Sequence, residues 1–161
     1  MEFAWRVHPA LDAGIGKVDI KASILLAFQG GGFVYTTTSP EVLAAAERLP
    51  GVITGVRSIL VIAMALSAIA ILPFLGSSRR HRADHLQEWI YFGHVRLWQA
   101  VDLATRLSQL SEHDELVALS AQLVRMSRIN WRKHRLLQVS VLLSLLAMAA
   151  MMVAMTPRAG I

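Results

Sequence analysis

The pattern of apolar positions is dominated by two uninterrupted runs, at residues 59–75 and 136–155. The second run holds 20 residues and no ionisable side chain, and at about 1.5 Å per residue in a helix it matches a hydrocarbon core of about 30 Å. The first run reaches a comfortable length when its helix starts near Val52, which includes Arg57 near one end. We expect Arg57 to snorkel to the headgroups, and the alternative is a lipid-contacting or gating role. We predict that both runs cross a membrane.

A third apolar stretch, at residues 22–38, is interrupted by Gln29 and by three glycines at 30–32. These residues lower helix propensity, although glycine is common in membrane helices, where it allows close packing. Basic side chains precede the stretch at Arg6, Lys17 and Lys21. We predict a third span here, which forms a transmembrane hairpin at 22–76 together with the span at about 52–75.

The connector between these two spans carries the signals of a short helix at 40–49. Ser39 is placed to cap its N-terminus, Pro40 fits its first turn, and Pro50 with Gly51 ends it. We expect this helix to be a plain connector on the outer surface of the membrane, and the alternative is a partner-binding role.

The segment at 77–135 is basic and lies between two predicted spans. Its Lys and Arg residues are Arg79, Arg80, Arg82, Arg96, Arg106, Arg125, Arg128, Arg132, Lys133 and Arg135. The positive-inside rule places this segment in the cytoplasm, together with residues 1–21. The final span then covers 136–156 and leaves 157–161 outside, which makes a multi-pass membrane protein. The net charge of +5 fits this topology and contact with anionic lipid better than it fits nucleic acid.

Helical periodicity divides the basic segment into two arms, so the sequence predicts an all-α membrane protein with a cytosolic antiparallel helical hairpin. The first arm has a seam with alternating spacings of four and three, at Leu86, Ile90, Gly93, Leu97, Ala100, Ala104 and Leu107. The pattern breaks at 111–115, where Ser111 fits an N-cap with Asp114 three residues on. A second stripe, at Leu119, Leu123, Met126 and Ile129, continues without Gly or Pro into the last span. We therefore expect one helix of roughly 40 residues, about 60 Å long.

Small residues recur on the last span at spacings of three and four. They are Ser140, Ser144, Ala147, Ala150 and Ala154. Such a stripe is typical of a helix that packs closely against other helices in lipid, so we expect this face to hold spans together.

Signatures of enzymes are absent from the sequence. There is no cysteine and no GxSxG, HExxH or phosphate-binding GxxxxGK[ST] motif. His81 and His85 have a spacing of four that can chelate a metal, but the sequence offers no evident third ligand beyond the adjoining Asp84. We therefore expect no enzymatic activity, no metal and no cofactor.

Two groups of polar residues in apolar surroundings are candidates for ligand binding. Asp19 and Lys21 stand at the head of the first stretch, and the segment 88–98 surrounds Gly93 with Tyr91, Phe92, His94 and Arg96. An aromatic ring can stack on a base, and an arginine can hold a phosphate. Close helix packing with an interfacial aromatic belt explains the same residues, so spacing alone leaves both interpretations open.

Four segments in order resemble the Pycsar transmembrane effectors of bacterial antiphage defence: DIKASILLAFQGG at 19–31, ILPFLG at 71–76, WIYFGHV at 89–95 and AQLVRMSRINWRKHRLLQVSVLL at 121–143. The resemblance extends from about residue 12 to residue 152, and its specificity comes from the ordered combination of short motifs. In that family a partner cyclase makes a cyclic pyrimidine mononucleotide on infection, and the effector impairs the inner membrane. The resemblance implies a homo-oligomeric protein of the bacterial inner membrane that senses cyclic CMP or cyclic UMP and causes abortive infection.

Carried onto this chain, the resemblance nominates nucleotide-binding residues at Asp19, Lys21, Tyr91, Phe92, Gly93, His94, Gln122 and Lys133. The negative charge of a cyclic phosphate adds Arg96 to these candidates. The chain departs from the family pattern after Lys133, where His134 stands in place of the expected aromatic residue and Trp131 lies two positions before the lysine. This departure bears on the role of Lys133.

Two alternatives to a nucleotide-sensing effector remain at this point. One is a constitutive membrane scaffold whose cytosolic part binds a protein. The other is a holin-like pore former that needs no signal. Neither would respond to a cyclic nucleotide.

Overall fold

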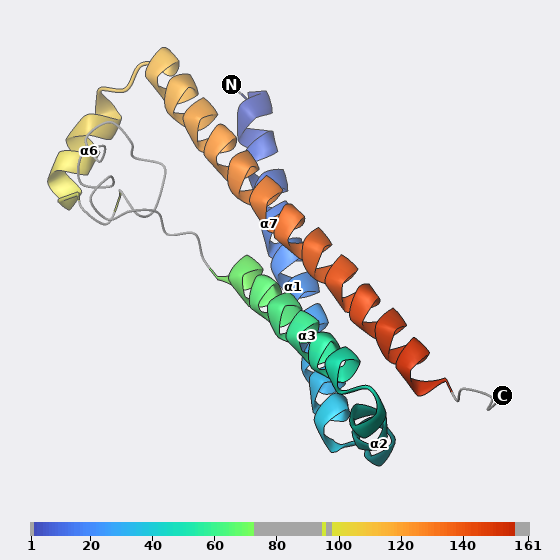
Figure 1. The fold of residues 1–161 in the computed structure, drawn as a ribbon. Coiled ribbons are helices and arrows are strands. Elements are labelled where there is room, and N and C mark those ends of the chain that lie inside the picture. The colour runs from blue at the N-terminus through green and yellow to red at the C-terminus, as the bar shows by residue number, and fades with distance from the viewer. Residues whose placement is uncertain (1, 73–94, 96–97, 157–161) are drawn as a thin grey trace. The chain divides into compact units, whose positions relative to one another are not determined.

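The computed structural model describes residues 2–72, 95 and 98–156 of the chain. Within these ranges the backbone forms helices and turns, and no strand. The helices are α1 at Glu2–Thr38, α2 at Pro40–Arg48, α3 at Pro50–Ile71, α6 at Ala100–Ser108 and α7 at Glu112–Met155 (Figure 1). The all-α class predicted from periodicity is confirmed.

Contacts divide the chain into two units, one of Met1–Ile15 with Pro73–Trp131 and one of Gly16–Leu72 with Arg132–Ile161. In the second unit, α1 and α7 run in the same direction. Asp19 pairs with Lys133 and Gln29 bonds to Ser140, so residue numbers rise together along the two helices. α3 runs in the opposite direction, because its Ser67 meets Ser140 while its Leu60 packs with the later Ala147.

The packing face of α3 repeats with the period of a coiled coil. Its buried residues are Ile53, Val56, Leu60, Ala63, Ser67 and Ala70. The alternating spacings of three and four keep this seam against neighbouring helices along the whole of α3. Exposed apolar side chains, including Val61, Ile62 and Ile69, cover other faces of the helix. A helix that is apolar on both its packed and its exposed faces suits a hydrocarbon environment.

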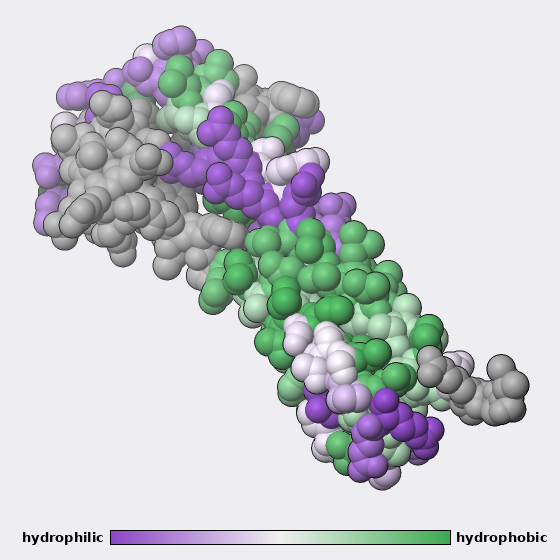
Figure 2. Space-filling model, in the orientation of Figure 1, coloured by the Kyte–Doolittle hydropathy of each residue, from purple (hydrophilic) through white to green (hydrophobic). Residues whose placement is uncertain are grey.

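Among the described residues, α3 and α7 are the two helices that are long and apolar enough to cross a membrane. Figure 2 shows apolar side chains gathered over the helices of the second unit and polar side chains at the end where α2 lies. These features associate the chain with a membrane. α1 does not reach the same apolar level, so the third span at 22–38 stays a prediction, as do the multi-pass topology and its orientation.

α2 is the short helix expected between the first two spans. Ser39 stands at its N-cap position, but the Ser39 hydroxyl donates to the Glu41 carboxylate at 2.5 Å and makes no bond to a backbone N–H of the first turn. Pro50, expected to end this helix, is the first residue of α3, a position where its missing N–H has no helical partner to lose. Val42, Ala45 and Ile53 form an apolar cluster that holds α2 on α3.

Arg57, near the start of α3, has a partner inside the protein. Its Nη2 donates to the backbone carbonyl of Thr36, near the end of α1. That carbonyl has no helical donor, because the residue four positions on is Pro40, which lacks an N–H. A cation at a helix C-terminus also complements the negative end of the helix dipole. Arg57 therefore caps α1, a role that the sequence pattern did not indicate.

In the first unit, the start of α1 contacts the first part of α7. The Trp5 indole donates to the Glu115 carboxylate at 2.8 Å, and a Cβ added to Gly14 would stand 3.1 Å from Nδ2 of Asn130. Leu119 and Met126 of α7 are buried. The apolar stripe predicted on this part of α7 is confirmed, and its neighbour is the N-terminal part of the same chain.

A capping box closes the N-terminus of α7, as the sequence predicts. Oγ of Ser111 accepts from the Asp114 backbone N–H at 3.1 Å, while the Asp114 carboxylate accepts from the Ser111 hydroxyl at 2.8 Å and from its backbone N–H at 3.3 Å. The bond from the hydroxyl, followed by that from the N–H, holds the pKa of Asp114 below its ordinary value. From this cap α7 continues for 44 residues, so the predicted long, continuous helix is observed.

The first arm of the predicted hairpin is not seen as one helix. Residues 73–94, 96 and 97 lie outside the described part of the chain, and α6 begins only at Ala100, after Gln99 with an extended backbone. The expected seam positions Ala100, Ala104 and Leu107 are exposed. Because the backbone of Gln99 is extended, no helix runs unbroken through residue 99. Without a buried face, a short helix such as α6 gains little stability from packing. The cytosolic hairpin stays a prediction.

Candidate functional site

Buried residues recur along α7 at intervals of seven. They are Leu119, Met126, Lys133, Ser140 and Ala147. Seven residues make two helical turns, so these side chains lie on one face of α7. Along that face the residues change from large and apolar to charged, polar and small. The last three belong to the second unit, where α1 and α3 surround them.

Lys133 forms an ion pair with Asp19 of α1. The distance from Nζ to Oδ1 is 2.5 Å, and the side chains are 4% and 34% exposed. A buried ammonium needs a close counter-charge, because removing it from water costs several kcal/mol. The sequence nominated both residues as nucleotide ligands, and the structure pairs them with each other. Because the Lys133 side chain is only 4% exposed, another anion can reach its ammonium only if the surrounding side chains move.

A buried cluster of polar side chains joins α1, α3 and α7 two turns further along α7. Nε2 of Gln29 donates to Oγ of Ser140 and to Oγ of Ser144, each at 2.8 Å. The Ser140 hydroxyl donates to the backbone carbonyl of Ala63 and pairs with the Ser67 hydroxyl, both at 2.8 Å. One hydrogen-bonded group thus holds three helices in register, as polar residues do inside membrane bundles.

The protons of this cluster can be assigned completely. The Ser144 hydroxyl donates its proton to the Ser140 carbonyl, and the Ser140 hydroxyl donates its proton to the Ala63 carbonyl. Neither hydroxyl has a second proton, so both can only accept from Gln29, and the donor must be the Gln29 amide NH₂. The assignment fixes the orientation of the Gln29 amide. It leaves Oε1 of Gln29 buried without a hydrogen-bond partner among the described residues.

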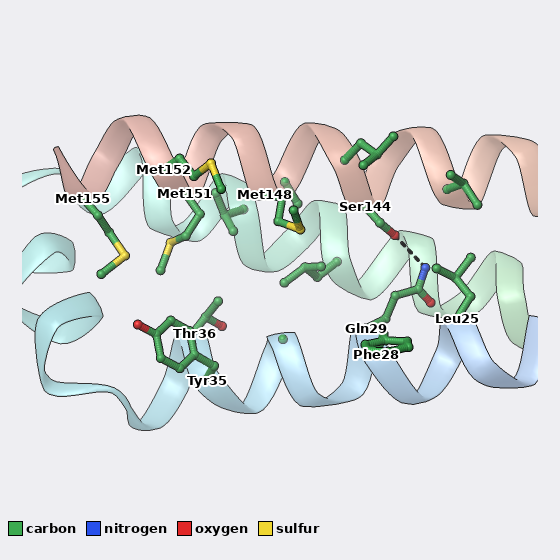
Figure 3. Close-up of a pocket in the computed structure, with 16 residues that line it drawn as sticks. Leu25, Phe28, Gln29, Tyr35, Thr36, Ser144, Met148, Met151, Met152 and Met155 are labelled. Atoms are coloured by element: carbon green, nitrogen blue, oxygen red, sulfur yellow. Dashed lines mark hydrogen bonds between the residues drawn. The ribbon is translucent and has the colours of Figure 1, made fainter.

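An apolar layer follows the polar cluster on the side toward α2. Val56, Leu60 and Ala147 are buried together, and Phe33 packs against them. The same three residues line a cleft of about 430 Å³ between α1 and α7. Figure 3 shows the bond between Gln29 and Ser144, and Met151 and Met155 of α7 extending toward the part of α1 that carries Tyr35 and Thr36.

The remaining residues nominated from the sequence do not join this group in the described structure. Lys21 is exposed, because a residue two positions from Asp19 points to a different face of α1. Gln122 is half-buried on α7 in the first unit. Tyr91, Phe92, Gly93, His94 and Arg96 lie outside the described residues. Nucleotide binding by these side chains therefore stays a prediction.

Sequence reasoning missed three members of the buried group. Gln29 was noted only as a residue that lowers helix propensity, and Ser67 and Arg57 had no assigned partner. A signal was available for Gln29 and Ser67, since a polar side chain within an apolar run needs an internal partner in lipid. In the small-residue stripe, Ser140 and Ala147 are buried and pack against α1 and α3 of the same chain, while packing of this face in lipid stays a prediction.

Metal-binding clusters of three or more His, Cys, Asp or Glu side chains do not occur within the described ranges. His81 and His85 lie outside those ranges. The absence of a metal stays an expectation for the whole chain.

The fold and its buried polar group define the class as an all-helical, membrane-associated protein. A family model described as the Pycsar effector protein domain matches residues 3–157, and the chain belongs to this family. It is therefore a Pycsar effector of antiphage defence, as its sequence motifs indicated. No curated protein and no solved structure matches the chain.

Proposed function

We propose that this chain senses a cyclic pyrimidine mononucleotide, cyclic CMP or cyclic UMP, and responds by impairing the integrity of the bacterial inner membrane. The observation that carries the proposal is the match of a Pycsar effector domain to nearly the whole chain. The bundle of the second unit adds physical support, because its exposed faces are apolar while its interior holds an ion pair and a hydrogen-bonded polar cluster. Polar groups at that depth are costly and are typical of functional sites in membranes.

The continuity of α7 supports a coupling between a soluble and a membrane part. α7 runs as one helix from its cap at Ser111 to Met155. In the proposed function, a change in packing near the start of α7 reaches its apolar part through this one helix. A nucleotide drives such a change only if it binds one arrangement of the helices more tightly than the other.

The Asp19–Lys133 pair is a natural point for that coupling. A cyclic phosphate carries one negative charge and competes with Asp19 for the Lys133 ammonium. Loss of the pair would remove an attachment between α1 and α7 at one end of the polar group. The proposal therefore gives Lys133 a role that depends on exchange of partners. It includes assembly into a homo-oligomer and functional pairing with a nucleotide cyclase, and it assigns no enzymatic activity to the chain.

Thermal unfolding of the detergent-solubilised protein tests nucleotide sensing directly. A ligand at one hundred times its Kd stabilises the bound state by about 2.7 kcal/mol, so the unfolding temperature should rise with cyclic CMP or cyclic UMP and stay unchanged with linear CMP or UMP. Equal curves with all four nucleotides would overturn the proposal and favour a scaffold. Killing of cells that express the chain without any cyclase would favour a holin-like pore former.

A further inference from the structure

We propose that the interior seam of the second unit is a gated path along which water and small inorganic ions cross the membrane. The inference rests on the proposed function and specifies how the membrane loses its integrity. Permeability then arises along a defined line between α1, α3 and α7, with named polar residues and a named closing layer. Disordered damage to the lipid is the outcome that the experiment must separate from it.

Polar groups occur at three levels of the seam. The first holds Asp19 and Lys133, the second is centred on Gln29, and the third holds Thr36 with Arg57. On α1 the levels are ten and seven residues apart (19 to 29 and 29 to 36), about 15 Å and 10 Å at the rise of a helix. They therefore cover about 25 Å of a hydrocarbon core that is about 30 Å thick. A buried row of polar groups over that distance is typical of an ion pathway.

Two atoms of this row point to water in another state of the bundle. Oε1 of Gln29 and Nε of Arg57 are buried and have no hydrogen-bond partner among the described residues. Leaving such a group unsatisfied is unfavourable, because it has lost its bond to water and gained no other. A role limited to holding the helices together accounts for the bonded serines but not for these two atoms. Entry of water along the seam would satisfy both.

The layer of Val56, Leu60 and Ala147 closes the seam between the second and third levels. A narrow apolar constriction excludes water and ions by dewetting, and it conducts once it widens or becomes polar. The cleft of about 430 Å³ beside this layer gives the side chains room to move. Gln29 and Thr36 line the same cleft (Figure 3), so a polar side chain in place of Leu60 or Ala147 would make its wall polar from one level to the next.

Substitutions that make the closing layer polar test the inference. Leu60→Ser and Ala147→Ser place a hydroxyl in the layer, and Ala147→Ser changes the side-chain volume little. Their controls are Val61→Ser and Ala149→Ser, which also replace an apolar side chain by serine, at exposed positions of the same helices. Each purified full-length variant is placed in vesicles of phosphatidylethanolamine and phosphatidylglycerol that hold a potassium gradient and entrapped carboxyfluorescein. Decay of the potential reports ions, and dye release reports large solutes.

Without nucleotide, we expect the potential to decay at least fivefold faster with Leu60→Ser and Ala147→Ser than with the wild type or the controls, while the dye stays inside. Decay at the wild-type rate in both folded variants would overturn the inference, and so would dye release in step with ion loss. Ala147→Ser decides the matter if Leu60→Ser does not fold. Failure of the proposed function is a separate result, in which cyclic CMP and cyclic UMP leave the wild-type vesicles unchanged.

Discussion

The two parts of α7 bury opposite kinds of side chain on one continuous face. The first part buries Leu119 and Met126, and the second part buries Lys133, Ser140 and Ala147, each seven residues from the next. The exposed faces change in the other direction, from mixed and charged to almost wholly apolar. Burial of apolar surface is favourable in water, whereas in lipid, helices associate through close packing and internal hydrogen bonds. The change along this face is the one expected for a helix that passes from water into lipid, as we propose for α7.

The two parts of α7 also differ in the kind of contact that holds them to their neighbours. Burial of Leu119 and Met126 accounts for the packing of the first part of α7 in the first unit. The ion pair and the polar cluster of the second part cost energy to bury and are held by specific partners, Asp19 and Gln29. Such partners can be exchanged for a ligand or for water. We therefore expect a signal to act on the ion pair and the polar cluster of the second part.

The largest effect is expected from breaking the ion pair on one side. Asp19→Ala leaves the Lys133 ammonium buried without its counter-charge, so we expect a loss of about 3–5 kcal/mol of stability. Unfolding of the purified protein in a denaturing detergent titration measures it. Asp19→Leu with Lys133→Met removes both charges and should restore most of the loss.

Lys21→Ala is the matched control on the same helix, because its side chain is exposed. We expect it to change stability by less than about 0.5 kcal/mol. Equal stability of Asp19→Ala and Lys21→Ala would show that the pair does not hold α1 and α7 together.

A smaller loss is expected where the seam is apolar. Leu119 is 0% exposed, and Leu119→Ala removes buried surface and leaves a cavity, at a cost of about 2–4 kcal/mol. Val117→Ala, at a position that is 55% exposed, should have little effect. The same titration checks both, and similar values for the two variants would contradict the apolar seam of the first unit.

Removal of the Gln29 amide should have a moderate effect. Gln29→Leu deletes two bonds to Ser140 and Ser144, and polar bonds between membrane helices contribute about 0.6 kcal/mol on average, with a maximum near 1.7. Loss of the unpartnered Oε1 offsets part of that cost. We expect a net change below about 1 kcal/mol in the titration, and a loss as large as that of Asp19→Ala would contradict this description of the cluster.

An effect of similar size, confined to the first turn, is expected at the cap of α7. Ser111→Ala removes the bond to the Asp114 N–H, and loss of an N-cap costs about 1 kcal/mol. Hydrogen exchange of the first-turn amides should therefore become faster. Amides in the middle of α7 serve as the internal control.

The pH dependence of the same cap has a definite sign. The folded pKa of Asp114 is lowered, so its contribution is present above the unfolded pKa of about 3.9 and is lost as the pH falls through the folded value. Protection of the first turn should fall with acidification in the wild type and change less in Ser111→Ala. Identical pH profiles would contradict the capping box.

Local signals in the sequence predicted much of the fold. The cap at Ser111, the stripe at Leu119 and Met126 and the unbroken course of α7 each depend on spacing within one helix, and each is observed. The short helix between the first spans is also present, at Pro40–Arg48. Of the arm expected at 86–107, the described residues show only the end, where α6 begins at Ala100 after an extended Gln99 and has no buried residue.

The partners within the site could not be predicted in the same way. Asp19 and Lys133 are 114 positions apart, and their meeting depends on the register of α1 against α7. The register between two packed helices cannot be derived from the spacing of residues along one of them. The capping of Thr36 by Arg57 likewise follows from a turn that places Pro40 after α1.

The central claim is that a cyclic pyrimidine nucleotide opens this protein to ions. The most direct test is the decay of a potassium diffusion potential in vesicles that contain the wild-type chain, before and after addition of nucleotide. Cyclic CMP or cyclic UMP should accelerate the decay, and linear CMP and UMP should leave it unchanged. The same decay with and without the cyclic nucleotides would contradict the claim.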